Sequence, residues 1–169
     1  MSESAKKLTL IKQDLFSGNN SLILNTIENI RLQSNISVIP LLLDLYCVSQ
    51  NEDVKHAIKK CLFDLKDQHA AGIIVSALSE KKYFSIKSVI LESMWQCGLD
   101  YSEYAETIVS TICTDTFENT IEAVTVLETI EESIPDTKRS EYSQKLNAAA
   151  ETKEGSHKAL IFEAVAMLD

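Results

Sequence analysis

The stretch VIPLLLDLY, residues 38–46, has the composition of a buried helix but carries a proline in its first half. Proline removes one backbone N–H donor and kinks or breaks the helix interior that contains it. The following stretch, VKHAIKKCLFDL at residues 54–65, has apolar residues at helical spacing and no proline. We therefore expect two helices here, a first helix kinked at Pro40 and a regular second helix.

Helical periodicity runs along almost the whole of the 169 residues. The chain has only 4 Gly and 2 Pro, which leaves few positions for the turns of β structure. Short polar links separate the segments, and the candidate N-caps are Asn51, Ser102, Thr116 and Asp136. We expect an all-α fold of ten helices, at about residues 3–16, 20–33, 36–49, 52–66, 69–79, 83–97, 102–114, 117–132, 137–151 and 156–168.

The even-numbered helices repeat one another. Four segments, VKHAIKKCLFDL, IKSVILESMWQC, TIEAVTVLETIE and HKALIFEAVAML, begin at residues 54, 86, 120 and 157 and align column by column. Columns four, five and eight hold apolar or small residues almost throughout, and this spacing places them on one helix face. A two-helix unit cannot bury such a face alone, but stacked units can.

This repetition predicts one domain over residues 1–169, a right-handed α-solenoid of about five antiparallel helix pairs. The expected pairs cover about residues 3–33, 36–66, 69–97, 102–132 and 137–168.

Residues 36–66 resemble a HEAT repeat, an armadillo-type helix pair. In that pattern an Ile-Pro pair lies in the first helix, Leu residues and an Asp follow, and an Asp and a basic residue open the second helix. The matching residues are Ile39, Pro40, Leu41, Leu42, Asp44, Asp53, Val54, Lys55, Ala57 and Leu62. The resemblance implies a superhelical scaffold for protein binding. HEAT-like solenoids also include DNA glycosylases and phycobilin lyase-like proteins, which leaves an enzymatic reading open.

Charge is distributed unevenly along the chain, whose net charge is −9. Residues 1–97 hold 11 Lys/Arg and 10 Asp/Glu, whereas residues 98–169 hold 5 and 15. From Asp100 to Asp136 there are ten acidic residues and no Lys or Arg. Such an acidic half is a poor partner for phosphate backbones, so we expect no nucleic-acid partner. A nucleic-acid-binding solenoid stays open as an alternative, with scattered lysines as its candidate contacts.

No catalytic motif stands out, so we expect no enzyme, cofactor or metal. The glycines are isolated, and none of the common nucleophile or phosphate-binding patterns occurs. The cysteines Cys47, Cys61, Cys97 and Cys113 lie in apolar helical stretches and form no closely spaced pair. We interpret them as free thiols in a reducing compartment, with a zinc site as the alternative. No apolar run is long enough for a membrane span, and no secretory signal is recognisable, so we expect a cytoplasmic protein with no membrane partner.

The second helices offer a candidate binding surface. Phe63 and Trp95 occupy equivalent positions on the helix side opposite the core columns, and we expect Leu91 to lie next to them. Together these three would form an apolar patch bordered by Lys55, Lys59 and Lys87. The alternative is that Phe63 and Trp95 fill the seam between neighbouring helix pairs.

The acidic stretch is the second candidate surface, in which Glu118 and Glu122 would pair with a basic segment of another protein. A solvated face without a partner is the alternative. We expect a non-catalytic scaffold or adaptor that holds a peptide or partner domain on its concave side. The apolar last helix is either covered by the ninth helix or pairs with a second copy, which would give a homodimer through the C-terminal pair.

Overall fold

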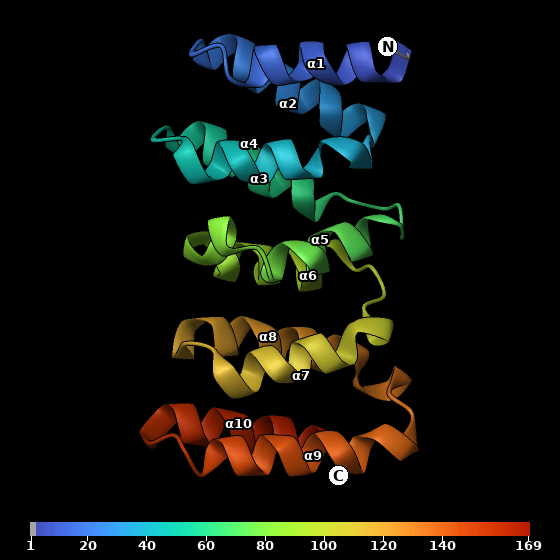
Figure 1. Cartoon of the computed structure of the whole chain (residues 1–169), viewed down its shortest axis with the longest axis vertical. Coiled ribbons are helices and arrows are strands. Elements are labelled where there is room, and N and C mark those ends of the chain that lie inside the picture. The colour runs from blue at the N-terminus through green and yellow to red at the C-terminus, as the bar shows by residue number, and fades with distance from the viewer. Residues whose placement is uncertain (1–2) are drawn as a thin grey trace. The chain divides into compact units, whose positions relative to one another are not determined.

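The computed structural model describes residues 3–169, which form ten α-helices joined by short links (Figure 1). The α-helices are α1 (Glu3–Leu15), α2 (Asn20–Gln33), α3 (Ile39–Val48), α4 (Glu52–Phe63), α5 (Ala70–Leu78), α6 (Lys87–Cys97), α7 (Ala105–Thr114), α8 (Phe117–Ile130), α9 (Asp136–Ala150) and α10 (Gly155–Leu168). Four 3₁₀ segments accompany them, η1 (Ile36–Val38), η2 (Lys81–Ile86), η3 (Ser102–Tyr104) and η4 (Glu131–Ser133). The expected all-α fold and its ten helices are confirmed.

Pro40 starts a helix and does not kink one. It lies in the first turn of α3, directly after the 3₁₀ segment η1. In that turn the backbone N–H groups have no partner within the helix, so the missing donor of proline costs nothing. The expected kink at Pro40 is therefore wrong, and the proline instead marks where the α-helix begins.

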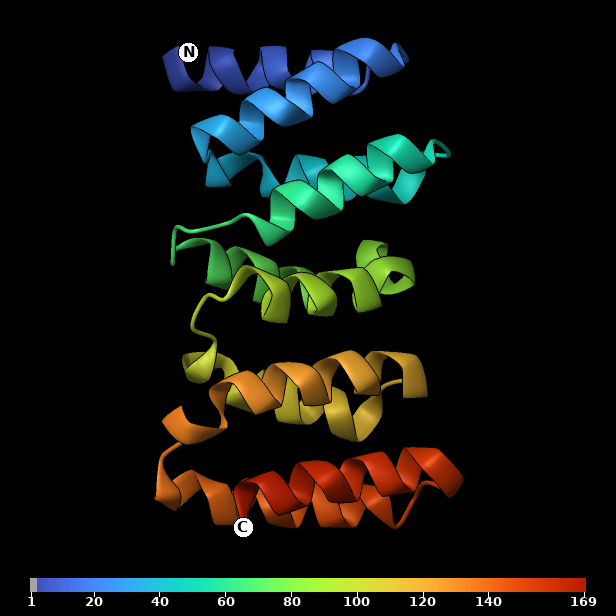
Figure 2. The same ribbon diagram turned by 180° about the vertical axis from the view of Figure 1, so that it is seen from behind.

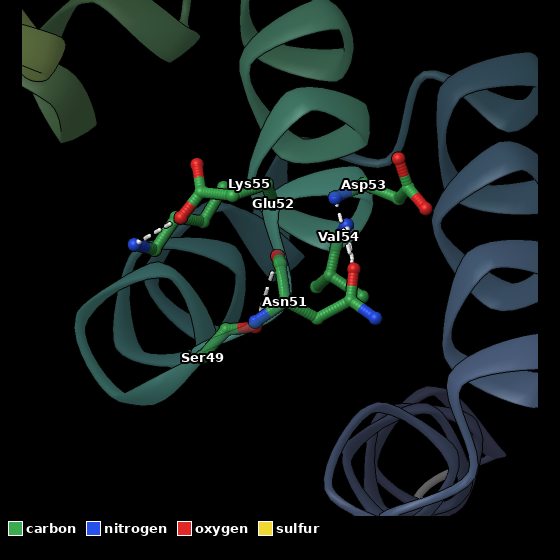
Figure 3. Close-up of polar contacts among 6 residues, drawn as sticks. All are labelled: Ser49, Asn51, Glu52, Asp53, Val54 and Lys55. Atoms are coloured by element: carbon green, nitrogen blue, oxygen red, sulfur yellow. Dashed lines mark hydrogen bonds and ion pairs between the residues drawn. The ribbon is translucent and has the colours of Figure 1, made fainter.

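Asn51 caps α4, as its sequence position predicts (Figure 3). Its Oδ1 accepts hydrogen bonds from the backbone N–H groups of Asp53, at 2.9 Å, and Val54, at 3.1 Å. The Oγ of Ser49 accepts from the backbone N–H of Asn51 at 3.2 Å and so fixes the turn itself. The link between α3 and α4 is consequently short, and hydrogen bonds within it hold the turn.

The other expected caps differ in detail. Thr116 caps α8, and its Oγ1 accepts from the backbone N–H of Asn119 at 3.4 Å. Ser102 is the first residue of η3, and its backbone N–H donates to Asp100 Oδ1 at 2.8 Å. Asp136 is the first residue of α9, so the cap position falls one residue earlier.

The helices gather into two compact units. The N-terminal unit ends at Val89 and the C-terminal unit begins at Ile90, so the division falls within α6. In the N-terminal unit α1 contacts α2 and α3, α2 contacts α4, and α3 contacts α4 and α5. In the C-terminal unit α7 contacts α8 and α9, and α10 contacts α8 and α9. Contacts thus join mostly neighbouring helices, while the single domain over residues 1–169 stays a prediction.

Within each unit the first and second helices of the pairs lie on opposite sides. Figure 1 shows α1 and α3 towards the viewer in the N-terminal unit, and α7 and α9 in the C-terminal unit. Seen from behind in Figure 2, the near helices are α2 and α4 in the one unit and α8 and α10 in the other. The second helices therefore pack against one another inside a unit, as the contacts α2–α4 and α8–α10 also record.

Two of the three expected core columns are buried in all four aligned helices. Column five consists of Ile58, Ile90, Val124 and Ile161, and column eight of Cys61, Ser93, Leu127 and Ala164. Column four is less regular, because Ala123 is buried whereas Ala57, Val89 and Leu160 are half-buried. Columns five and eight therefore lie on the buried face of the second helices.

The last helix is covered within its own unit. Ile161, Val165 and Leu168 of α10 are buried, and α10 packs against α8 and α9. Phe162 is 38% exposed. The first of the two alternatives, that α9 covers this helix, is therefore observed. A homodimer through the C-terminal pair stays a prediction. No helix within residues 3–169 combines the length and the apolar character that crossing a bilayer requires.

Replacing Ile161 by Ala should destabilise the C-terminal unit by about 2–5 kcal/mol, because it leaves a cavity in column five. Ile121→Ala is the matched control, since Ile121 lies on a second helix of the same unit and is 42% exposed. We expect the control to cost less than about 1 kcal/mol. Urea unfolding followed by circular dichroism measures the stability of both variants. Equal losses of stability would contradict the assignment of Ile161 to the buried face.

Asn51→Ala should lower the stability of the N-terminal unit by about 1 kcal/mol, because two backbone N–H groups of α4 lose their acceptor. Gln50→Ala changes the exposed neighbour and should leave stability nearly unaltered. The comparison is made by thermal unfolding of the two variants and the wild type. An Asn51→Ala protein as stable as Gln50→Ala would show that the cap contributes nothing.

Candidate functional site

The eight residues expected at the binding surface divide between the two units. Lys55, Lys59, Phe63 and Lys87 belong to the N-terminal unit, and Leu91, Trp95, Glu118 and Glu122 to the C-terminal unit. They therefore make two groups, one in each unit.

In the N-terminal unit, lysine side chains lie over aromatic rings. The Nζ of Lys59 is 5.6 Å from the ring centre of Phe63, one turn further along α4, and both side chains are half-buried. Lys55 Nζ is 5.9 Å from the ring centre of Tyr46 and 3.0 Å from Glu52 Oε1 (Figure 3). Cation–π contacts that stay partly accessible to water contribute only about 0.5–1 kcal/mol each. Phe63 is thus neither fully exposed nor buried. Both lysines already contact side chains of their own unit.

Lys87 lies beside an aromatic residue that the sequence reasoning missed. Its Nζ is 4.8 Å from the ring centre of Phe84, whose side chain is 55% exposed. Phe84 belongs to η2, where the sequence predicted the start of a continuous helix. The 3₁₀ turn changes the angular spacing of residues, so a wheel drawn for an α-helix cannot place Phe84 correctly.

Leu91 does not lie on the surface. Its side chain is 0% exposed, next to Ile90 of column five and one turn before the buried Met94. The buried arc of α6 is therefore wider than columns five and eight alone define. The expectation that Leu91 forms an exposed anchor is corrected here, because a side chain with no accessible area cannot meet a partner in this conformation.

Trp95 and Glu122 come together in the C-terminal unit. The indole Nε1–H of Trp95 on α6 donates a hydrogen bond to Glu122 Oε2 on α8, with an N–O distance of 2.7 Å. Both side chains are half-buried. The bond has a charged acceptor, which makes it stronger than a neutral one, and it holds the indole in one orientation. The structure therefore unites one expected aromatic anchor with one expected acid.

The acids of the stretch from Asp100 to Asp136 fall into two classes. Some have partners inside the unit, such as Glu106, whose Oε1 is 2.6 Å from the Nζ of Lys145. Others, including Glu118 and Glu128, are exposed and form no ion pair with any residue that the structure describes. The second class leaves negative charge on α8 without a neutralising neighbour.

Exposed apolar side chains accompany these acids. Phe117 and Ile121 of α8 are each 42% exposed. At about 100° per residue, Phe117, Glu118, Ile121, Glu122 and Glu128 fall within an arc of about 140°. We call these five residues the α8 surface. Phe117 and Ile121 were missed from the sequence, although their four-residue spacing placed them on one face of that helix.

The neighbouring helix α10 supports one end of the α8 surface. The ring of Phe117 lies 5.5 Å, between ring centres, from that of His157. The hydroxyl of Thr120 donates to Thr116 O at 2.9 Å, and Thr120 Oγ1 also forms a hydrogen bond with His157 Nε2 at 3.0 Å. Burial, reinforced by Lys153, lowers the pKa of His157. These contacts hold Phe117 beside α10.

The four cysteines are free thiols. Burial raises the pKa of Cys61 to about 11, so this thiol stays protonated and unreactive at neutral pH. Burial also raises the pKa of the half-buried Cys47 and Cys113, whose thiols donate to backbone carbonyl oxygens at 3.7 Å. Among the described residues, no group of three or more His, Cys, Asp or Glu side chains is placed to hold a metal ion.

Glu122→Ala should loosen the contact between α6 and α8, because it leaves the half-buried indole N–H without an acceptor. We expect a loss of about 1–3 kcal/mol in stability and a shift of tryptophan emission. Trp95 is the only tryptophan in the chain, so fluorescence reports on this position alone. Glu118→Ala, which removes an exposed acid one turn away, should change neither quantity. Identical spectra and stabilities in both variants would show that the hydrogen bond does not order the indole.

Comparison with known proteins gives no indication of function, so the evidence on function is these surfaces. No family model matches the sequence, no curated protein matches it, and no solved structure matches the fold. What is established is an all-α protein of ten helices within residues 3–169, packed mostly against their neighbours.

Proposed function

We propose that the chain is a non-catalytic adaptor that binds a basic segment of another protein on the α8 surface. Its helix pairs would stack as a right-handed, HEAT-like α-solenoid. The contacts between second helices, and the burial of columns five and eight in all four aligned helices, support that arrangement. In such a stack the outward side of the second helices is the binding side.

One observation carries the proposal. The α8 surface sets exposed acids, Glu118 and Glu128, beside exposed apolar side chains, Phe117 and Ile121. Large exposed apolar side chains do not help a surface that serves only solubility. A docking surface, in contrast, combines apolar side chains with charged ones. The fitting partner is an amphipathic segment with Lys or Arg on one side and Leu or aromatic residues on the other.

Trp95 gives the α8 surface a fixed edge. Its indole is held by Glu122 before any partner arrives, so binding would not have to order it. Aromatic residues held in this way are frequent among those that contribute most to binding. The C-terminal unit holds 5 Lys/Arg and 16 Asp/Glu, and this excess would also accelerate the approach of a basic partner.

The test titrates the protein with a helical peptide of Lys and Leu and follows Trp95 fluorescence. We expect binding that weakens with added salt, because the acids and the lysines lose attraction when screened. Glu118→Lys should weaken binding about tenfold, since it replaces an attraction by a repulsion. Glu154→Lys reverses another exposed acid of the same unit, outside the α8 surface, and should have little effect.

Affinity purification from a native lysate then seeks the natural partner with the same pair of variants. A protein retained by the wild type and Glu154→Lys but lost from a folded Glu118→Lys variant would support the proposal. If Glu118→Lys and Glu154→Lys weakened binding equally, the effect would come from net charge and not from the α8 surface. A Lys and Leu peptide that fails to bind at low salt would refute a basic partner on this surface.

A further inference from the structure

A groove in the N-terminal unit is distinct from the α8 surface. Two hollows adjoin each other there and share Phe16, just beyond α1, and Val48, the last residue of α3. One hollow, of about 460 Å³, is also lined by Lys12, Asp44, Cys47 and Tyr83. The other, of about 530 Å³, is floored by Leu15, Ile23 and Leu45. We call the two hollows together the Phe16 groove.

The walls of the Phe16 groove are largely apolar and accessible. Phe16 is 42% exposed and Val48 is 62% exposed, while Leu15, Ile23 and Leu45 behind them are buried. The beginning of α4 closes one side, where the Ser49–Asn51 turn satisfies its own backbone donors (Figure 3). That wall therefore offers little polar recognition, and the groove favours an apolar side chain as its occupant.

The charge at the rim of the groove is positive. The carboxylate of Asp44 is 2.8 Å from the Nζ of Lys82 and accepts from the hydroxyl of Tyr83, also at 2.8 Å. Its negative charge is thereby compensated inside the unit. Lys12 is exposed and forms no ion pair with any described residue. An incoming carboxylate would thus meet an available ammonium group and no uncompensated anion among these rim residues.

We propose that the Phe16 groove binds an acidic peptide segment. A Leu or aromatic side chain of the segment inserts between Phe16 and Val48, and a neighbouring carboxylate pairs with Lys12. The adjoining hollow takes a second apolar side chain, which is why a peptide fits better than a single small molecule. The proposal rests on residues 12–51 and 82–83 alone, so it stands independently of the basic partner assigned to the α8 surface.

The test compares two short peptides, one that alternates Glu with Phe and Leu and one that carries Lys in place of each Glu. Binding is followed by the amide chemical shifts of the whole chain in NMR. We expect the acidic peptide to bind more tightly and to move the amide signals of Cys47 and Val48. Tight binding of the Lys peptide at these same amides would overturn the proposal.

Variants of exposed residues locate the effect without threatening the fold. Val48→Glu should weaken the acidic peptide about tenfold, because it places a charge in the apolar centre of the groove. Its matched control is Leu32→Glu, in the last turn of α2, where Leu32 is 71% exposed. Lys12→Glu should weaken binding about fivefold, whereas Lys60→Glu, in the last turn of α4, should not.

Each outcome decides the proposal. Loss of acidic-peptide binding in Val48→Glu and Lys12→Glu, with both controls intact, supports the site and its ligand chemistry. No binding of the acidic peptide, equal losses in the controls, or shifts confined to the C-terminal unit would each overturn it. A failure here leaves the Lys and Leu peptide experiment on the α8 surface unaffected, because that surface lies in the other unit.

Discussion

Burial of the apolar helix faces is the constraint on which the packing inside each unit depends. On the second helices the buried positions include Ile58 and Cys61 of α4, and Ile161 and Ala164 of α10. Since burial of apolar area is the main favourable contribution to folding, second helices are driven against second helices. The contacts α2–α4 and α8–α10 meet this requirement inside the two units.

The periodic part of the sequence predicted the ten helices and their buried positions for a physical reason. Columns five and eight recur in four helices with apolar or small residues, and both columns are buried in every one of them. Pro40 was harder, because its effect depends on whether it lies inside a helix or at its first turn. The neighbouring residues are compatible with either position of the proline. In the structure the 3₁₀ segment η1 precedes it, so Pro40 falls in the first turn of α3.

Surface positions were predicted less well than core positions. Trp95 and Glu122 were both expected at a binding surface, and they meet across two helices. Leu91 was misplaced, because the width of a buried arc depends on how closely neighbouring helices approach, which periodicity does not encode. The Phe16 groove was not foreseen at all. It arises where Phe16 and Val48 meet at helix ends 32 positions apart, and no column of the repeat contains both.

Contacts between near neighbours have a consequence for how the molecule is made. The helix contacts of the N-terminal unit lie among α1 to α5 and η2, all of which precede Val89. A ribosome delivers these segments first, at about 5–20 residues per second. Their partners are therefore already outside the exit tunnel while the acidic half is still being translated. Because short loops close quickly, a nascent chain of this kind can bury the apolar faces of its N-terminal unit before the C-terminal unit is complete.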